Sequence, residues 1–491
     1  MLELFKIKLK NNHYLYLFLI YLLIAVPIAY LRFPDIRNEI KYFIISKNIL
    51  IKKNYFVLRY FSEFYPDKPP LYFWILSFCQ KIFPNNFFFV SVLLTSIVPS
   101  FILIIFFYKF LKNFKSKDGA FLMTLSLLTI PFFFGVSIFA RMDILMSLFI
   151  FLALYYFFGF YYKFIKISNI NLFLFYLFIF LALFTKGLAG FFLPTLILFV
   201  FLIVEKKLNF LKKIRFIKGN IFIICLIGLW FLVIIFEPQG KEYINAIIFK
   251  EAIGRVMKSK VHIRPFYYYI EQIPLIIFPY GILLLISLIH YIKNMFFTFT
   301  WTKLEKISFV WVVSSLIIFS LASGKLSIYL LPIFPAMVIL IYEAILNNKN
   351  KKYIEYGLKS VEIFSILAPI LNKKFNSEKK LYNRFLNINI SLLIIFFSLI
   401  FFIKIYNDNY TLKKFLPYLK QSSEKIVAYD FSDAKNLEFY IDKHIDNLTN
   451  ISYDNNNIII LTRKNDIANF ENKNYILIDK NKEYFLYKKI K

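Results

Sequence analysis

Stretches of about 20 apolar residues recur along most of this 491-residue chain, and they constrain its fold more than any other feature. A segment of that length and composition spans the core of a bilayer as a helix. The composition agrees, since 59% of the residues are hydrophobic and 18% are charged, against roughly 45–50% and about 25% in soluble domains. The sequence therefore excludes a soluble enzyme, a disordered chain and a small disulfide scaffold, and it predicts an all-α polytopic membrane protein.

The apolar runs predict eleven membrane-spanning helices. They cover residues 14–31, 87–111, 119–139, 143–163, 170–185, 187–204, 220–236, 269–291, 307–322, 328–346 and 389–405. Two shorter apolar runs, 71–84 and 361–371, raise the number to thirteen at most. Most lysine-rich connections fall on one side of this alternation, and such loops stay in the cytoplasm. The N-terminus is therefore predicted to lie inside and the C-terminus outside.

The net charge of +31 does not indicate a nucleic-acid partner. Lysine far outnumbers arginine, and Ile, Phe, Asn and Tyr are abundant, which is the usual skew of a low-GC genome. Cys79 and Cys225 form no metal or disulfide pattern. Because no small-residue cleavage site follows the first apolar run, we predict an uncleaved first span rather than a signal peptide.

Two external segments, 32–86 and 237–268, carry more basic residues than external loops usually do. Long loops translocate despite positive charge, which is one explanation. The alternative is an external cavity that binds anionic substrates. Residues 406–491 differ from the rest of the chain, since helix-like and strand-like segments alternate there in place of long apolar runs. We therefore predict a membrane domain over residues 1–405 and a small external α/β domain over residues 406–491.

The segment FPDIRNEIKY, residues 33–42, follows the first span and mixes acids with bases. A carboxylate beside a membrane acts as a general base, or orients an acceptor, when its neighbours hold its pKa in range. The plainer alternative is an interfacial amphipathic helix, with Asp35 near its start and Glu39 paired to a nearby cation.

Two other segments place charges beside prolines or at a helix start. In YPDKPPLYFW, residues 65–74, two prolines fix an extended backbone next to Asp67 and Lys68. A lysine there is a compact cation for phosphate, and an aspartate holds a metal or the lysine itself. Arg141 and Asp143 lie at the entrance of the fourth span, where Asp143 can also simply cap the helix.

Single lysines occupy two tight external turns, Lys186 in FTKGLAG and Lys325 in LASGKLSIY. Snorkelling explains one interfacial lysine, whereas two on the same face favour an anion site. The segment VHIRPFYYY, residues 261–269, contains His262, the one histidine among external charged residues near aromatics. Paired with a carboxylate from another loop, His262 would suit Zn²⁺.

Taken in chain order, these segments resemble the GT-C glycosyltransferases of the protein O-mannosyltransferase superfamily, and most of all the 4-amino-4-deoxyarabinose lipid A transferases. The shared order is an acidic motif after the first span, an acid-Lys-Pro motif, an Asp at a span entrance, a TKG turn, a His-x-x-Pro-Phe-aromatic-Tyr motif and a GKL-x-x-Y turn. The likeness covers residues 14–345. It implies a GT-C fold of eleven to thirteen helices with external loops 32–86 and 237–268 on the periplasmic face.

The resemblance also implies catalytic residues. The family's first-loop aspartate acts on, or positions, the acceptor, and two alignments are open here. Pro34-Asp35 matches after a two-residue insertion, whereas alignment back from the next helix places Asn38-Glu39 at the family's Asp-Glu pair. We favour Asp35, with Glu39 second. Asp143 matches the family's second important aspartate.

The remaining site residues follow from the same resemblance. Asp67 and His262 match the positions that hold zinc in the aminoarabinose transferases, with Asp67 in place of Glu. The implied phosphate and substrate contacts are Lys68, Arg141, Lys186, Arg255, Arg264 and Lys325, with Tyr329 on the donor side.

The resemblance implies an inner-membrane glycosyltransferase that moves a sugar, with inversion, from a polyprenyl-phosphate donor to lipid A or another periplasmic glycolipid. A protein O-glycosyltransferase with the same donor is the alternative within this class. A transporter or flippase for lipid-linked sugars is the rival from another class, and a non-catalytic lipid-phosphate binder is a third possibility. Charges at the external ends of the spans, and the lack of an internal repeat, favour the enzyme.

Overall fold

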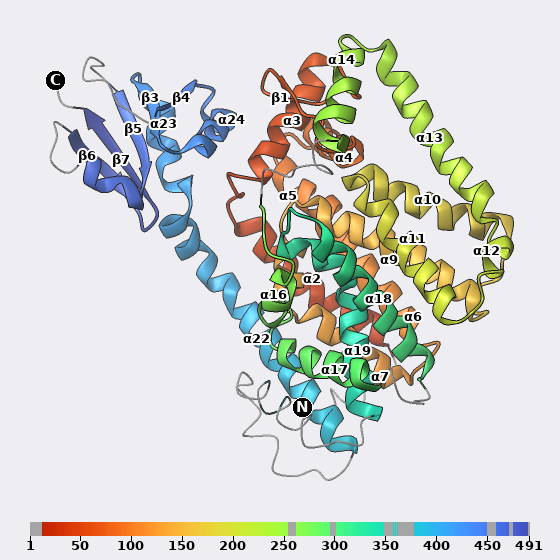
Figure 1. The fold of residues 1–491 in the computed structure, drawn as a ribbon. Helices are drawn as coiled ribbons and strands as arrows, with labels where there is room; N and C mark the ends of the chain where they lie inside the picture. The colour runs from red at the N-terminus through yellow and green to blue at the C-terminus, as the bar shows by residue number, and fades with distance from the viewer. Residues whose placement is uncertain are drawn as a thin grey trace.

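The computed structural model describes residues 12–253, 262–294, 301–347, 378–448, 458–470 and 475–489, together with 357, 359 and 361. These residues form a helical body and a smaller C-terminal α/β unit, joined by one long helix, α22 (Glu378–Tyr410) (Figure 1). The fold class predicted from the sequence is confirmed. The predicted division at residue 405 stays a prediction, since α22 runs through that position to Tyr410.

Eight helices or joined helices in the described part of the chain are long and apolar enough to cross a membrane. They are α2 (His13–Leu31), α5–η1–α6 (Phe87–Val92, Leu93–Ile97 and Val98–Leu111), α9 (Met142–Tyr161), α10 (Asn169–Lys186), α13 (Phe216–Phe236), α18 (Lys303–Leu321), η3–α19 (Ser327–Ile333 and Phe334–Asn347) and α22. Two shorter apolar helices are α11 (Ala189–Val204) and α17 (Gly281–Asn294).

Two predicted spans are broken in the structure. Residues 119–139 form α7 (Lys117–Leu128) and α8 (Pro131–Ser137), bent by 70°. Residues 269–291 form α16 (Tyr268–Ile276) and α17, separated by a turn that contains Pro279. Proline cannot donate the helical hydrogen bond and restricts the residue before it, which explains both breaks. The apolar run 71–84 is the short helix α4 (Leu71–Ile82), and the run 361–371 lies outside the described residues apart from residue 361.

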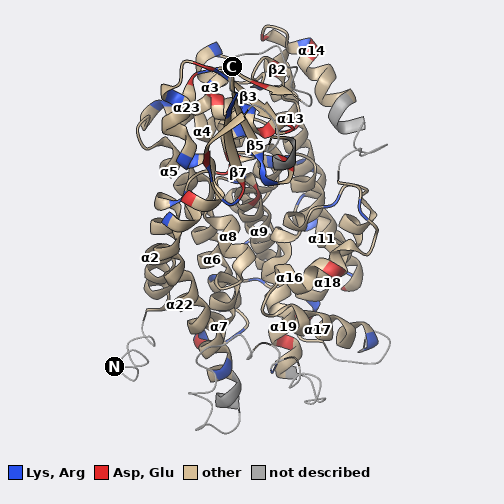
Figure 2. Ribbon diagram, turned by 90° about the vertical axis from the view of Figure 1, so that its left-hand side faces the viewer, with Lys and Arg blue, Asp and Glu red and all other residues tan. Residues whose placement is uncertain are grey.

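Helix α9 lies at the centre of the helical body, and 83% of its most apolar stretch is buried. Helices α6, α10 and α11, together with η3, pack around it (Figure 1). We call the end of the body that carries α3 (Glu39–Lys52), α4 and α14 (Gly240–Asn245) the loop face. Charged residues gather toward the two ends of the body, and the zone between them is largely uncharged, as expected for a membrane protein (Figure 2).

Short elements complete the loop face and the connections. They are the hairpin of β1 (Arg59–Tyr60) and β2 (Glu63–Phe64), α12 (Phe210–Lys213) and the π-helical η2 (Ala246–Ile253).

The C-terminal unit is a five-stranded sheet with strand order β4-β3-β5-β7-β6. Strand β3 runs parallel to β4 and β5, and β7 runs antiparallel to β5 and β6. Its elements are η5 (Leu412–Phe415), α23 (Leu416–Gln421), β3 (Lys425–Tyr429), η6 (Ser432–Leu437), α24 (Glu438–Ile441), β4 (Ile445–Leu448), β5 (Ile458–Arg463), η7 (Lys464–Asn469), β6 (Tyr475–Lys480) and β7 (Tyr484–Lys489). Strands β3 to β7 all lie in the part of the chain where strand-like segments were predicted to alternate with helix-like ones.

Helix α3 packs into two cores at once. Ile40 and Ile44, with Ile36 just before the helix, belong to the core of the C-terminal unit. Phe43 and Ile45, on another side of the same helix, belong to the core of the helical body. The acidic segment predicted around residue 35 is therefore held between the two units.

We predict that Gly190→Ala destabilises the protein. A Cβ at Gly190 would overlap the Ala182 carbonyl, where α11 turns back against α10. Such overpacking costs about 1–3 kcal/mol, and the melting temperature of detergent-solubilised protein should fall. The control is Gly228→Ala in α13, because a Cβ there meets no described atom within 4 Å. Equal melting temperatures for the two variants would contradict the prediction.

Candidate functional site

Asp143 lies at the loop-face end of α9 and is buried, with 2% of its side chain exposed. Its carboxylate accepts hydrogen bonds from the Lys186 ammonium and from Arg141 Nε, the latter at 3.2 Å. Asp143 falls in the first turn of α9 and Lys186 in the last turn of α10, where the helix dipoles favour these charges. Two neighbouring helix ends thus place a buried carboxylate between two cations.

The Lys186 ammonium also lies 4.9 Å from the centre of the Tyr329 ring, in η3. We call Arg141, Asp143, Lys186 and Tyr329 the α9 cluster. All four were predicted as site residues, and segments about 190 residues apart in sequence bring them together. Two cations against one carboxylate leave an excess positive charge, which suits a ligand that carries or develops negative charge.

Arg141 is fixed in place and stays charged. Its backbone N–H donates to Ser96 Oγ at 3.3 Å, in the π-helical turn η1. Burial lowers the pKa of Arg141, but its neighbours, Asp143 first among them, more than offset this, and the net result is a pKa above the ordinary value. The guanidinium is therefore a permanent cation beside Asp143.

Glu39 is fully buried, and hydrogen bonds occupy both of its carboxylate oxygens. Arg32 donates to both oxygens, at 2.6 and 2.5 Å. The backbone N–H groups of Asp35 and Ala140 donate at 2.7 and 2.5 Å. Arg32 Nε in turn donates to the Ile138 carbonyl at 2.8 Å. Because no oxygen of Glu39 is left to accept a proton from a substrate, its geometry is that of a positioning residue, which ties the first loop to the segment between α8 and Arg141.

Asp35, the favoured catalytic carboxylate, is half-buried just before α3. Its Oδ2 accepts hydrogen bonds from the backbone N–H and the side-chain amide of Asn38, at 2.8 and 3.0 Å. These bonds close the turn just before α3, whose own N-cap residue is Asn38. Within the described residues no hydrogen bond is made to Oδ1, so this oxygen is the one available for an acceptor.

Tyr42 stands amid these charged groups and was missed from the sequence. Burial raises the pKa of Tyr42 above its ordinary value. Arg141 acts against this shift electrostatically, whereas Asp143, Asp67 and Asp35 reinforce it. All four charges thus lie within electrostatic range of one phenol, which stays protonated and can donate a hydrogen bond. Its position one turn beyond Glu39 on α3 was the available signal.

The other predicted contacts form two local groups. Lys68 donates through Nζ to the backbone carbonyl of Asp67 at 2.9 Å, in the turn before α4. Lys325 is buried, and its ammonium donates to the carbonyls of Arg264 and Ala322 at 2.9 and 2.5 Å. In this structure Lys325 therefore holds two backbone segments together.

The segment that contains His262 pairs with the Lys325 turn through backbone hydrogen bonds. The Lys325 N–H donates to the His262 carbonyl at 3.0 Å, and the Arg264 N–H donates to the Ser323 carbonyl at 3.3 Å. The side chains of His262 and Arg264 are exposed. Arg255 lies outside the described residues. The assignment of these residues to phosphate binding stays a prediction.

The donor set does not complete a zinc site. Zinc in proteins takes three or four protein ligands. Asp67 and His262 would supply two, and within the described ranges no group of three or more His, Cys, Asp or Glu side chains could hold a metal. Zinc binding therefore stays a prediction.

The sequence is similar to a known protein family and to individual known proteins. Residues 67–232 match the model of the dolichyl-phosphate-mannose-protein mannosyltransferase family. An uncharacterized protein of Aquifex aeolicus is 27% identical over 379 residues, covering 73% of this chain and 70% of its own length. The undecaprenyl phosphate-alpha-4-amino-4-deoxy-L-arabinose arabinosyl transferase of Wigglesworthia glossinidia brevipalpis is 26% identical over 72% of this chain, and the match spans 61% of that relative.

A solved structure shares the whole architecture. The crystal structure of ArnT from Cupriavidus metallidurans bound to undecaprenyl phosphate superposes with a TM-score of 0.69 at 13% sequence identity, covering 96% of this chain and 97% of that one. The chain thus has the GT-C fold. The family match and the similarity to named arabinosyl transferases confirm the prediction of a glycosyltransferase.

We predict that Glu39→Gln lowers the stability of the protein strongly. The substitution leaves the buried Arg32 guanidinium without its counter-charge, and breaking a buried pair in this way costs about 3–5 kcal/mol. Thermal denaturation in detergent measures the effect. The matched control is Glu63→Gln, since Glu63 is exposed on β2. If the two variants have the same melting temperature, the Arg32–Glu39 ion pair does not stabilise the protein as predicted.

Proposed function

We propose that this protein transfers a sugar from a polyprenyl-phosphate donor to lipid A or another glycolipid, on the periplasmic face of the inner membrane. The observation that carries the proposal is the α9 cluster, in which two cations lie beside a buried carboxylate at the loop face and one of them also lies over a tyrosine ring. The names of the similar proteins supply the donor class, since one relative is an undecaprenyl-phosphate-dependent transferase and ArnT was solved with undecaprenyl phosphate bound.

The chemistry of the reaction fits this cluster. The bond between the anomeric carbon and the phosphate oxygen breaks, and its electron pair stays on the lipid phosphate. Lys186 and Arg141 would stabilise that developing charge in a water-poor site, where fixed cations are most effective. The acceptor oxygen attacks the oxocarbenium-like carbon from the opposite side, which inverts its configuration.

Asp143 serves this reaction indirectly. It accepts hydrogen bonds from both cations, so it fixes their positions and offsets part of their mutual repulsion. The stack of Lys186 on Tyr329 limits the ammonium to the same region. The two cations are therefore already ordered before the substrate binds, which lowers the entropic cost of forming the charged site.

The role of Asp35 depends on the acceptor. A hydroxyl acceptor must lose its proton as it attacks, and Asp35 would take it. A phosphate acceptor is already ionised and needs no base, so Asp35 would then only position it. The mannosyltransferase family match is the observation that favours a protein hydroxyl as the second candidate acceptor.

The lipid-linked sugar transporter has less support. Transporters place ionisable residues near the membrane midplane. The charges assigned to the site here lie at helix ends on the loop face. These positions favour transfer at the membrane surface over passage through the bilayer.

Deletion of the gene in its own host is the first test of the proposal. Lipid A and lipopolysaccharide core should lose a single sugar mass, by mass spectrometry, when the gene is deleted, and plasmid-borne protein should restore it. If the glycolipids are unchanged and an envelope glycoprotein loses the sugar, the protein acceptor replaces the glycolipid in the proposal. If neither changes, sugar transfer itself is contradicted.

We predict that Lys186→Met reduces transfer by about 10²–10³-fold in kcat, the usual loss when one charge-stabilising donor is removed. Asp143→Asn should reduce it as well, because Lys186 and Arg141 lose their common partner. Asp118→Asn is the charge-matched control for Asp143→Asn, since Asp118 is largely exposed at the opposite end of the body. Purified protein, a polyprenyl-phosphate sugar and the acceptor identified above provide the assay. Retained activity in Lys186→Met would remove the α9 cluster from the proposal.

The substitution Asp35→Asn distinguishes the two acceptor classes. With a hydroxyl acceptor, we expect transfer to fall by about 10²–10⁴-fold and to lose its dependence on the ionisation of that carboxyl group, because the base is gone. With a phosphate acceptor, the pH profile should keep its shape. The readout is kcat against pH for both forms.

A further inference from the structure

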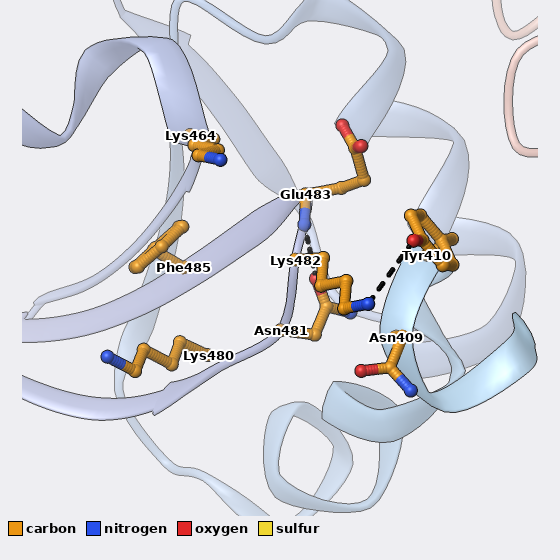
Figure 3. Close-up of a pocket in the computed structure, with 8 residues that line it drawn as sticks. All are labelled: Asn409, Tyr410, Lys464, Lys480, Asn481, Lys482, Glu483 and Phe485. Carbon is orange, nitrogen blue, oxygen red and sulfur yellow. Dashed lines mark hydrogen bonds between the residues drawn. The ribbon is translucent and has the colours of Figure 1, made fainter. Parts of the chain in front are cut away.

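A hollow of about 650 Å³ opens where α22 meets the C-terminal sheet, and no part of the reaction above uses it (Figure 3). The end of α22, the start of η7 and the turn between β6 and β7 form its walls. Three lysines, Lys464, Lys480 and Lys482, line it together with one acid, Glu483. Its chemistry is therefore that of an anion site.

The three lysines are not neutralised by neighbouring acids. Within the described residues none of them forms an ion pair, whereas nearby Lys414 pairs with Asp479 at 2.5 Å. The Lys482 ammonium lies 3.4 Å from the Tyr410 hydroxyl and 5.4 Å from the centre of its ring. In Figure 3 the Glu483 carboxylate points away from the ammonium groups of Lys480 and Lys482. Three cations and one acid leave the hollow with an excess of two positive charges.

Backbone hydrogen bonds hold the walls of the hollow in place. The Lys482 N–H donates to the Asn409 carbonyl at 3.0 Å, and the Lys464 N–H donates to the Glu483 carbonyl at 3.0 Å. Asn481 closes the turn, because its Oδ1 accepts from two backbone N–H groups and its Nδ2 donates to the Thr411 carbonyl at 2.8 Å. Lys480 and Lys482 thus lie at a fixed turn attached to α22, and Lys464 is held to the same turn through its backbone.

The hollow lies at the level where the chain leaves the membrane. Asn407 on α22 donates to the Leu31 carbonyl and accepts from the Phe33 N–H, both at 2.9 Å, so it lies beside the end of the first span. One face of α22 exposes large apolar side chains up to this level, including Phe401 at 71% and Phe402 at 58%. Lipid is the environment that suits such a face.

Aromatic rings mark the border between the apolar face and the lysines. Tyr406 and Tyr410 are stacked with ring centres 5.7 Å apart, and both are exposed. Tyrosines of this kind collect at the headgroup level of membranes. Lysines immediately outside such a border meet lipid phosphates.

We propose that this hollow binds the phosphate of an anionic lipid headgroup and so holds the C-terminal unit against the membrane surface. The ligand chemistry is a phosphate carried on a lipid, either a glycerophospholipid or a phosphorylated glycolipid. The proposal depends on the membrane level of the hollow and on its lysines, and it stands whether or not the protein transfers a sugar.

Photocrosslinking of the full-length protein in phosphatidylcholine nanodiscs tests the proposal. The probe is phosphatidylglycerol with a headgroup-proximal diazirine, and the labelled peptides are mapped by mass spectrometry. We expect label on residues 409–410 or 480–485 from this probe, and little from the matching phosphatidylcholine probe. The triple variant Lys464→Gln, Lys480→Gln, Lys482→Gln should lower the apparent affinity by on the order of 100-fold, taking roughly five-fold for each lysine near a charged surface.

The control is a second triple variant with the same loss of charge, Lys420→Gln, Lys425→Gln, Lys488→Gln. Lys425 and Lys488 lie toward the other end of the sheet, since they pair in register with Ile458 and Ile459, away from the β6–β7 turn, and Lys420 lies on α23. Their surface ion pairs contribute little stability, so both triple variants should melt alike. Equal labelling of both variants, or equal labelling by the phosphatidylcholine probe, would overturn the proposal.

Competition identifies the source of the phosphate. Unlabelled lipid A or unlabelled phosphatidylglycerol should displace the probe, and whichever is stronger names the preferred lipid; both results support a lipid phosphate. Displacement by the same concentration of inorganic phosphate would assign the hollow to a free anion and overturn the lipid proposal.

Discussion

The buried ion pair between Arg32 and Glu39 is the interaction on which the loop face depends. Both groups leave water on folding, and the large cost of burying them is offset only because every oxygen of Glu39 is hydrogen-bonded. Its four bonds join the end of the first span, the turn at Asp35 and the backbone just before Arg141. The acidic first loop and the α9 cluster are therefore fixed relative to each other by one side chain.

The α9 cluster repeats this arrangement with one difference. Asp143 is as buried as Glu39, but its donors are side chains on two helices, not backbone groups of one loop. Lys186 and Arg141 remain 12% and 23% exposed, so a ligand can reach them past Asp143. The Arg32–Glu39 pair is inaccessible and structural. In the α9 cluster the two cations are partly accessible, which suits binding of a phosphate.

The sequence predicted most of the fold, because apolar length alone determines where helices cross a bilayer. It missed the breaks in residues 119–139 and 269–291, where proline geometry overrides hydropathy. For the site, motif order singled out the four residues that the structure brings together in the α9 cluster, and their role in transfer is a proposal. Motif order could not distinguish the roles of Asp35 and Glu39. The difference is that hydrogen bonds from Arg32 and Ala140 fill the oxygens of Glu39, and Ala140 is about 100 residues away in sequence. Tyr42 was missed for the same reason, since its importance lies in the charges around it.

Helix α3 connects the C-terminal unit to the acidic turn that holds Asp35. Ile36, Ile40 and Ile44 complete that unit's core, and Asn436 donates to the Ile36 carbonyl at 2.8 Å, one residue from Asp35. Any ligand that changes how firmly the unit docks therefore changes the free energy of ordering the acidic turn. By thermodynamic linkage the effect is reciprocal, so occupation of the site must also alter the docking equilibrium.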